Sequence, residues 1–232
     1  MVQDVYKRVE MTGNISTGGP NSYVVAGDAA SLHLNNQMCF CIRLMFTHRI
    51  DSNVDSHTLV DKYDTAGGVT GFMVRVVGEQ LRCYSDGGVS RLDIADFITY
   101  RTVMHIVVNY NSTTGNIEAY RNGVFVAQGA YPSLTQNIKK YVVGSRQAGN
   151  ESNLMAHVYE VNLYNRYLTV AEIGYNHQRP NNPVRRGLVA CYAQHGINQI
   201  TADKWQDTSP LGTNNADIKN CTVTNYSQIS AR

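Results

Sequence analysis

The carboxylates are the first side chains to test for chemistry, because pairs of Asp and Glu side chains hydrolyse glycosidic bonds. In a retaining enzyme one carboxylate acts as nucleophile and the other as general acid, about 5 Å apart. Alternation along a strand would bring such a pair to one face, as in the pattern E-x-D-x-x-E. The chain lacks this pattern, and the nearest candidates are Asp93 with Asp96, and Glu79 alone. The sequence therefore does not favour a glycoside hydrolase.

Histidine and serine patterns supply no other catalytic site. The seven His residues are dispersed, and none belongs to an H-x-H or H-E-x-x-H pattern. The chain also lacks the G-x-S-x-G elbow of serine hydrolases and the glycine-rich loops that bind phosphates. His105 stands in an apolar run, so we expect it in the core or at an edge. The sequence predicts a protein without enzymatic activity.

The five cysteines form no C-x-x-C pair, so the sequence suggests neither a zinc site nor a redox motif. Cys39 and Cys41 are two residues apart in a strand-like run and share a face, which suits two buried small side chains. Cys191 and Cys221 flank the C-terminal loop and could form a disulfide. The alternative is that all five are free thiols.

The composition predicts one globular, β-rich domain. The chain has 232 residues, of which 43% are hydrophobic and 16% charged, which is enough for a core. Fifteen Tyr and 19 Gly favour strands joined by turns. The net charge of +2 is scattered, which argues against nucleic-acid binding. The densest basic cluster (Arg179, Arg185 and Arg186) is interrupted by prolines, so we interpret residues 177–186 as a solvated linker.

The N-terminal sequence "MVQDVYKRVEMTGN" has no apolar segment of the kind that opens a signal peptide. No run approaches the about 18–20 apolar residues of a membrane helix. We therefore expect cytoplasmic synthesis without membrane insertion. If the protein acts outside a cell, we expect it to leave by lysis, by a specialised route or within a virion or other extracellular particle.

The clearest local signals lie in the middle of the chain. Asn122-Gly123 separates two strand-like runs, and this dipeptide favours a type I′ hairpin turn because both positions need positive φ. Thr169 followed by Glu172 forms a capping box, which predicts one short helix over residues 169–176.

The run "NNQMCFCIRLMF" predicts a strand at the centre of a sheet. Alternation places one set of residues on one face: Met38, Phe40, Ile42 and Leu44. The other face receives Cys39, Cys41, Arg43 and Met45. Both faces are largely apolar, so we expect both to be covered.

Several segments of the second half follow one another in a recognisable order. The matching positions are His105, Ile106, Val107, Val108, Tyr110, Asn111, Tyr120, Asn122, Gly123, Gly144, Glu160, Val161, Leu163, Tyr164, Asn165, Arg166, Leu168, Glu172 and Ile173. They resemble the "W-x-H-V-A-V-T-Y-D", "L-Y-V-N-G" and "D-E-V-R-I-Y-N-R-A-L-S-x-x-E-I" segments of the laminin G-like, concanavalin A-like lectin/glucanase sandwich. Val103 and Tyr159 depart from the family's Trp and Asp. The resemblance implies an all-β, antiparallel two-sheet jelly roll with one short helix.

A C-terminal segment resembles another family motif, "D-x-S-G-x-G-N-x-G-x-L". The fitting residues are Asp207, Ser209, Gly212, Asn214 and Ile218. In the family this segment comes early, whereas here it comes last. We therefore predict a sandwich over residues 1–176, the linker, and a segment over residues 187–232 that completes an edge. That edge belongs either to the same chain, whose termini would then be neighbours, or to a neighbouring subunit.

The resemblance also implies two kinds of ligand. Many sandwiches of the family hold calcium with carboxylate and carbonyl oxygens. Glu160 stands at the family's acidic position and Asp28 lies in an early loop that could face it, so these two are the candidate ligands. The alternative is a buried Glu160 that is hydrogen-bonded to the backbone or to Arg166. No other cofactor is expected.

Sugars stack on aromatic side chains beside Asn and Asp. The aromatic candidates for glycan binding are Tyr63, Tyr84, Tyr100, Tyr131 and Trp205, and the sequence does not choose among them. Two functions of different classes remain. The first is a non-catalytic structural component of a virion (capsid, decoration or tail), which associates with itself or with other particle proteins. The second is a lectin-like module that binds surface glycans, with or without calcium.

Overall fold

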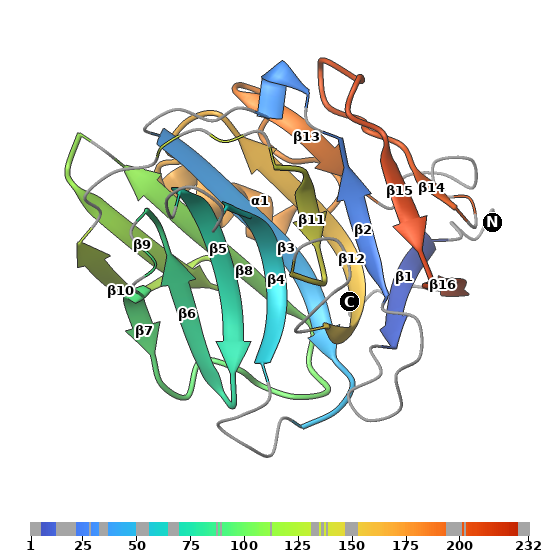
Figure 1. Cartoon of the computed structure of the whole chain (residues 1–232), viewed down its shortest axis with the longest axis horizontal. Helices are drawn as coiled ribbons and strands as arrows, with labels where there is room; N and C mark the ends of the chain where they lie inside the picture. Colours follow the sequence, from blue (N-terminus) through green and yellow to red (C-terminus); the bar gives the residue numbers. More distant parts are fainter. Residues whose placement is uncertain are drawn as a thin grey trace.

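The computed structural model is a sandwich of two antiparallel sheets of eight strands each, with a single α-helix among the residues it describes (Figure 1). These are residues 6–12, 22–27, 29–32, 37–49, 56–64, 70–86, 88, 90–111, 113–130, 135, 137, 139–146, 153–193, 201 and 203–226. The predicted all-β jelly-roll sandwich with one short helix is confirmed. No helix in these ranges is long and apolar enough to span a membrane.

Sheet A and sheet B pack face to face. Sheet A follows the order β10 (Val124–Ala130), β9 (Asn116–Arg121), β8 (Met104–Asn111), β3 (Gln37–Phe46), β12 (Met155–Tyr164), β1 (Tyr6–Thr12), β16 (Thr222–Tyr226), with β13 (Leu188–Tyr192) also on β12. Sheet B follows the order β14 (Lys204–Trp205), β15 (Ala216–Lys219), β2 (Tyr23–Ala26), β11 (Tyr141–Val143), β4 (Ser56–Asp64), β5 (Thr70–Val77), β6 (Gln80–Tyr84), β7 (Ser90–Ile94). The 3-10 turn η1 (Ala30–Leu32) follows β2.

Strand β3 is central and covered on both faces, as predicted. It pairs with β8 on one side and with β12 on the other. Its inner residues, such as Phe40 and Ile42, join the main core between the sheets. Cys39 and Cys41 join a second apolar cluster on the outer face of sheet A, which the helix α1 (Val170–Gln178) covers. The exception is Arg43, whose charge is paired on that outer face.

The two local predictions are confirmed. Asn122 and Gly123 have φ values of 54° and 82°, and they join β9 to β10 in a hairpin. Thr169 caps α1, with Glu172 closing the capping box. The helix runs through Gln178, two residues beyond the predicted end.

Paired amide and carbonyl groups fasten α1 to sheet A. Asn109 of β8 donates to the carbonyl of Leu168 and accepts from its amide, at 2.9 and 3.2 Å. Asn176 donates to the hydroxyl of Tyr164 at 3.0 Å and accepts from the amide of Val184 at 2.9 Å. The outer face of sheet A is therefore occupied by the helix and the segment that follows it.

That following segment packs more closely than the predicted linker. Asn181 is buried, and Val184 packs against the second cluster. The three arginines of the segment are exposed: Arg179, Arg185 and Arg186.

The C-terminal strands pair with early strands of the same chain. β15 pairs with β2 and β16 with β1, so β1 lies between β12 and the last strand, β16, whereas β13 pairs with β12. Asp207 organises the loop before β15, because its carboxylate accepts from the amides of Cys191, Ser209 and Asn214 at 2.8–3.1 Å. Whether residues 187–232 also exchange between copies of the chain stays a prediction.

All five cysteines are free. Cys191 lies in the second cluster beside Cys39 and Cys41, whereas the thiol of Cys221 donates to the carbonyl of Tyr23 at 3.7 Å. The suggested Cys191–Cys221 disulfide is absent because the two side chains belong to different layers.

Gly123 and Gly174 give a matched pair of tests. A Cβ at Gly123 would lie 3.2–3.4 Å from the His177 side chain, at a φ of +82°, whereas one at Gly174 would meet nothing within 4 Å. We expect Gly123→Ala to lower the free energy of unfolding by about 1–2 kcal/mol, because L-residues are strained there. Gly174→Ala should raise it by about 0.5–1 kcal/mol. Urea denaturation measures both, and equal effects would contradict the assigned turn.

Candidate functional site

Glu160 lies beneath α1 in a buried ion pair. Its Oε2 is 3.3 Å from Nε of Arg43, and its Oε1 accepts from Nδ2 of Asn162 at 2.7 Å. The side chains of Arg43 and Glu160 are only 12% and 4% exposed. The alternative of a hydrogen-bonded Glu160 had named Arg166, but Arg166 pairs instead with Glu172 at 2.6 Å.

These surroundings do not fit a calcium ion at Glu160. A divalent cation would have to compete with the guanidinium of Arg43, and calcium takes six to eight oxygen ligands. The described residues contain no group of three or more His, Cys, Asp or Glu side chains that could hold a metal ion. Asp28, the second predicted ligand, lies outside them. Glu160 and Arg43 together therefore have a structural role.

Arg43 also reaches the end of α1. Its Nη2 donates to the carbonyls of Asn176 and His177 at 3.1 and 3.0 Å, where a cation complements the helix dipole. The rings of His105 and His177 stack beside it, with centroids 5.8 Å apart and planes 17° apart. Burial first, and then Arg43, lowers the pKa of both imidazoles, that of His105 well below its usual range. His105 is thus a neutral, buried residue of β8.

The carboxylates considered for catalysis lie apart from this group. Asp93 and Asp96 are exposed, and Glu79 pairs with Arg49 at 3.4 Å.

The aromatic candidates for sugar binding separate into two groups. Trp205 is fully buried in the main core, and its Nε1 donates to the carbonyl of Ala193 at 3.2 Å, so its proposed sugar contact is wrong. Tyr100 packs edge-to-face on Phe46 against the same core. Tyr131 lies outside the described residues. Tyr63 and Tyr84 remain.

Tyr63 and Tyr84 belong to the outward face of sheet B. Tyr63 pairs with Gly71, and Met73 pairs with Asp61 on one side and Tyr84 on the other. The neighbouring residues Phe72 and Val74 point into the main core, so the alternate positions point outward. This is the face that the viewer sees in Figure 1, while α1 covers the opposite side of the molecule.

Charged side chains act electrostatically on the phenol of Tyr63. Asp86 accepts from the amide of Gly71 at 2.7 Å, directly across from Tyr63, and its carbonyl accepts from Nη2 of Arg91 at 2.7 Å. Burial raises the pKa of Tyr63, Arg146 and Arg91 oppose this, and Tyr84 and Asp86 add to it. We call Tyr63, Tyr84, Asp86, Arg91 and Arg146 the tyrosine–arginine cluster.

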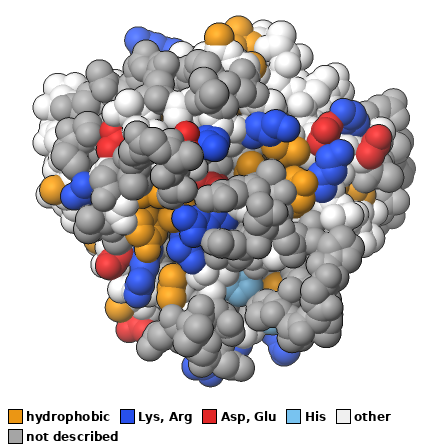
Figure 2. Space-filling model, in the orientation of Figure 1, with side chains coloured by type: hydrophobic (Ala, Val, Ile, Leu, Met, Phe, Trp, Pro, Cys, Tyr) orange, Lys and Arg blue, Asp and Glu red, His pale blue; other side chains and the backbone are white. Residues whose placement is uncertain are grey.

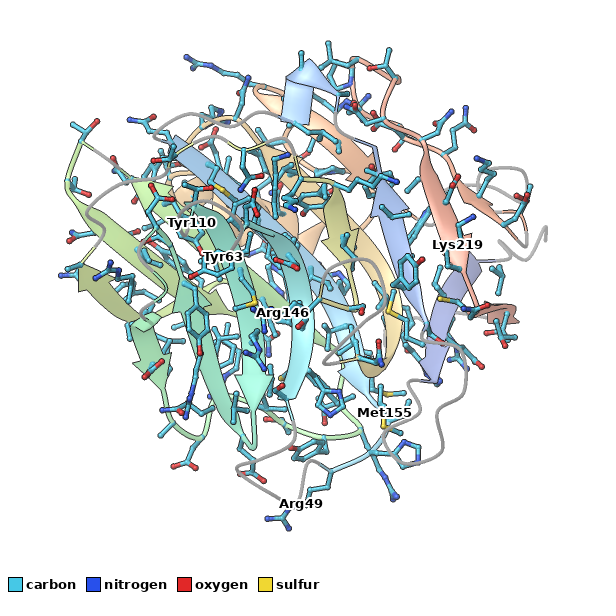
Figure 3. All side chains as sticks on the ribbon, in the orientation of Figure 1. Arg49, Tyr63, Tyr110, Arg146, Met155 and Lys219 are labelled. Carbon is cyan, nitrogen blue, oxygen red and sulfur yellow. The ribbon has the colours of Figure 1, made fainter. Side chains whose placement is uncertain are left out.

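The figures show the setting of this cluster. Figure 3 places Tyr63 and Arg146 on the viewer's side of sheet B. In Figure 2, Lys and Arg side chains lie next to hydrophobic ones across the middle of the same face. Tyr63 is buried, and the other four members are half-buried. Such a mixture of aromatic and hydrogen-bonding groups is typical of ligand sites.

The two arginines of the cluster were missed by the sequence. Arg91 comes from β7, and Arg146 follows β11, 55 positions later along the printed chain. The strand order puts β11 beside β4, with Val142 opposite Asp61 and Val143 opposite Val60, and so places Arg146 and Tyr63 on the same sheet. Arg146 could have been placed on this sheet only by predicting correctly which strands pair with each other.

The architecture is that of a lectin-type sandwich, with two antiparallel sheets and a helix on the outer face of one. The Laminin G 3 family model, described as the concanavalin A-like lectin/glucanases superfamily, matches residues 17–174. The chain belongs to this superfamily, which confirms the resemblance found in the sequence. A search among curated proteins found no match.

Solved structures with the same fold are distant in sequence. A carbohydrate-binding protein of Bacteroides ovatus, so described provisionally, has a TM-score of 0.69 at 16% identity, over 95% of this chain and 60% of that one. The heptameric SAP-like pentraxin of Limulus polyphemus has a TM-score of 0.66 at 11% identity, over 97% and 96%. The CBM40 of the Ruminococcus gnavus IT-sialidase, bound to α2,3-sialyllactose, has 0.55 at 13%, over 74% and 97%. The chain thus spans about three fifths of the Bacteroides protein.

The Glu160–Arg43 pair predicts a loss of stability that calcium does not restore. Glu160→Gln leaves Arg43 buried without its anion, and removing one partner of such a pair costs about 3–5 kcal/mol. Asp217→Asn, in an exposed pair with Lys204, serves as the control and should cost much less. Thermal denaturation with millimolar calcium or with EDTA should give equal melting temperatures for the wild type. A rise with calcium that Glu160→Gln abolishes would contradict the structural role.

The stacked imidazoles predict a stability that falls in mild acid. An unfolded His takes up a proton near pH 6.5, whereas the lowered pKa of His105 keeps the folded form neutral. The unfolded state then binds more protons, so stability falls as pH drops below about 6.5, by at most about 1.4 kcal/mol per pH unit for one group. Urea denaturation between pH 7.5 and 5.5 (roughly the imidazole window) measures the slope. His105→Gln should make the slope shallower, with His177, whose pKa is also lowered, keeping part of it, and an unchanged slope would exclude His105 as a cause.

Proposed function

We propose that this protein is a non-catalytic, lectin-like module that binds glycans on the outward face of sheet B. The observation that carries the proposal is the tyrosine–arginine cluster on that face. The other broad face of the sandwich, on sheet A, is covered by α1 and the second apolar cluster. On the outward face of sheet B, Tyr63 is buried, and the partly exposed members of the cluster are Tyr84, Asp86, Arg91 and Arg146.

The comparisons support this class of ligand. A Bacteroides ovatus protein with this fold is described as carbohydrate-binding, and the Ruminococcus gnavus CBM40 is bound to sialyllactose. Both are under 25% identical to this chain, so they support the scaffold and not particular residues. Aromatic rings stack on the apolar faces of sugars, and Tyr adds a hydroxyl for hydrogen bonding.

A purely binding role accords with the side chains. The carboxylates Asp93, Asp96 and Glu79 are exposed or paired with Arg49, and glycoside hydrolysis needs two carboxyl groups facing one bond. Some proteins with a similar fold are sialidases, such as that of Trypanosoma rangeli, of which this chain covers 26%. An assay with fluorogenic glycosides should therefore give no turnover above buffer.

The virion role predicted from the sequence ranks behind glycan binding. No feature of the described residues favours a capsid, decoration or tail component over a free module. Localisation in a particle and association with other copies stay predictions. They are compatible with glycan binding, because a particle surface can carry lectin modules.

Tyr84→Ala tests the site. The purified chain should bind discrete sugars on a glycan array, and calorimetry should show that Tyr84→Ala weakens the best one about 5- to 12-fold, as expected for loss of one aromatic contact of about 1–1.5 kcal/mol. Tyr175→Ala is the matched control, because Tyr175 is also part-exposed but lies on α1. Absence of any glycan ligand would refute the function. Equal losses in both variants would refute the site.

A further inference from the structure

A β-bulge brings two exposed side chains of β10 to the same face of sheet A. Phe125 pairs with Tyr120 of β9, and after a shift of register Gln128 pairs with Glu118 of the same strand. Residues three apart on a regular strand face opposite sides, but the extra residue of a bulge reverses this parity. Phe125 and Gln128 therefore both lie on the outer face, at the margin of the sheet (Figure 1).

The carboxylate of Glu118 is shared by two phenols. Its Oε2 accepts from the hydroxyl of Tyr120 at 2.8 Å and from that of Tyr167, which precedes α1, at 3.1 Å. Burial first, and then Glu118, raises the pKa of both phenols, so both remain protonated donors at neutral pH. Within the described ranges Glu118 forms no ion pair, and its Oε1 accepts no hydrogen bond. Glu118 is half-buried, so this oxygen and the negative charge are open to a ligand.

An exposed aromatic ring lies beside this carboxylate. Phe125 is 48% exposed, and its ring packs edge-to-face on Tyr120 with centroids 5.6 Å apart. Tyr167 is half-buried and Gln128 is exposed, whereas Tyr120 is buried and holds its neighbours in place. We call Glu118, Tyr120, Phe125, Gln128 and Tyr167 the carboxylate–aromatic patch. Hydrogen bonds, a ring contact and strand pairing join all five.

We propose that the carboxylate–aromatic patch binds the protonated primary amine of an amino sugar. The amine donates to Oε1 of Glu118, and the ring of Phe125 packs on the apolar face of the sugar. Gln128, opposite Glu118 on the edge strand, hydrogen-bonds a sugar hydroxyl. This site goes beyond the proposed function, because it lies at the margin of sheet A and shares no residue with the tyrosine–arginine cluster.

The charge of Glu118 favours an amine over a neutral sugar. A neutral ligand would cover the carboxylate without supplying a cation, and desolvating an unpaired charge is costly. A protonated amine offsets this cost with a charge-assisted hydrogen bond, which is about twice as strong as one between neutral groups. A quaternary ammonium has no N–H to donate, so the acceptor Oε1 favours a primary amine.

Calorimetry with three probes tests the proposal. The probes are a trisaccharide of glucosamine, the same trisaccharide with every amine acetylated, and Nα-acetyl-lysine amide, in buffer acidic enough to keep the amines protonated. We expect the glucosamine trisaccharide to bind about ten or more times tighter than its acetylated form, because acetylation removes the charge-assisted hydrogen bond. It should also bind tighter than the lysine derivative, which has no sugar ring for Phe125 to contact. Affinity should fall as sodium chloride rises, because salt screens charges.

Two variants assign the binding to the patch. Glu118→Gln keeps the size of the side chain and removes its charge, so it should weaken the glucosamine trisaccharide about 10- to 100-fold and change the acetylated form little. Phe125→Ala should weaken both sugars several-fold, because both lose the ring contact. Thermal denaturation checks that both variants are folded. Glu79→Gln is the control, because Glu79 is also half-buried but lies at the turn between β5 and β6 of sheet B.

The outcomes separate this proposal from glycan binding on sheet B. Equal affinity for the two trisaccharides refutes the amine, and tighter binding of the lysine derivative refutes the sugar. If Glu79→Gln weakens binding as much as Glu118→Gln, the placement at the patch is refuted. Tyr84→Ala should leave the affinity for the glucosamine trisaccharide unchanged, and a large loss in that variant would also refute the patch. If neither trisaccharide binds, this proposal fails, while a different glycan that needs Tyr84 would still support the function on sheet B.

Discussion

The buried guanidinium of Arg43 connects the centre of sheet A to the helix α1, which covers the outer face of that sheet. Through Glu160 it is tied to the centre of sheet A, and through two carbonyls it holds the C-terminal turn of α1. A lone buried cation would be costly, and so would two unsatisfied helix carbonyls. The Arg43 cation and the two helix carbonyls therefore satisfy one another's hydrogen-bonding needs. With α1 held there, the outer face of sheet A is covered by the helix and the second apolar cluster.

Most of the fold was predictable because its signals are local. The Asn122-Gly123 turn and the Thr169–Glu172 capping box each lie within four residues, and alternating apolar residues predicted β3. The end of α1 was misjudged, because Arg43 and Asn176 stabilise its last turn through contacts with other elements. The closeness of the supposed linker to the second cluster was missed for the same reason.

The site was less predictable, because its members meet only through strand order. Glu160 stood out as an acidic position of the family, but its partner Arg43 is 117 residues away, so only the fold reveals the ion pair between them. Trp205 and Tyr63 look alike as aromatic residues in turn-rich sequence. Side chains alternate between the two faces of a strand, and by this alternation Trp205 points into the core whereas Tyr63 points outward. Parity depends on register, which composition does not reveal.

The pairing of β16 with β1 and of β15 with β2 has a consequence for the order of synthesis. When the ribosome has made the helix, β1 and β2 have neighbours on one side only, and their other backbone edges await strands not yet translated. Unpaired edges are the surfaces at which nascent chains misassociate. Completion of both sheets is therefore a late event that follows synthesis of β15 and β16. Slow translation near residue 186 would prolong the stage at which the unpaired edges of β1 and β2 most need chaperones.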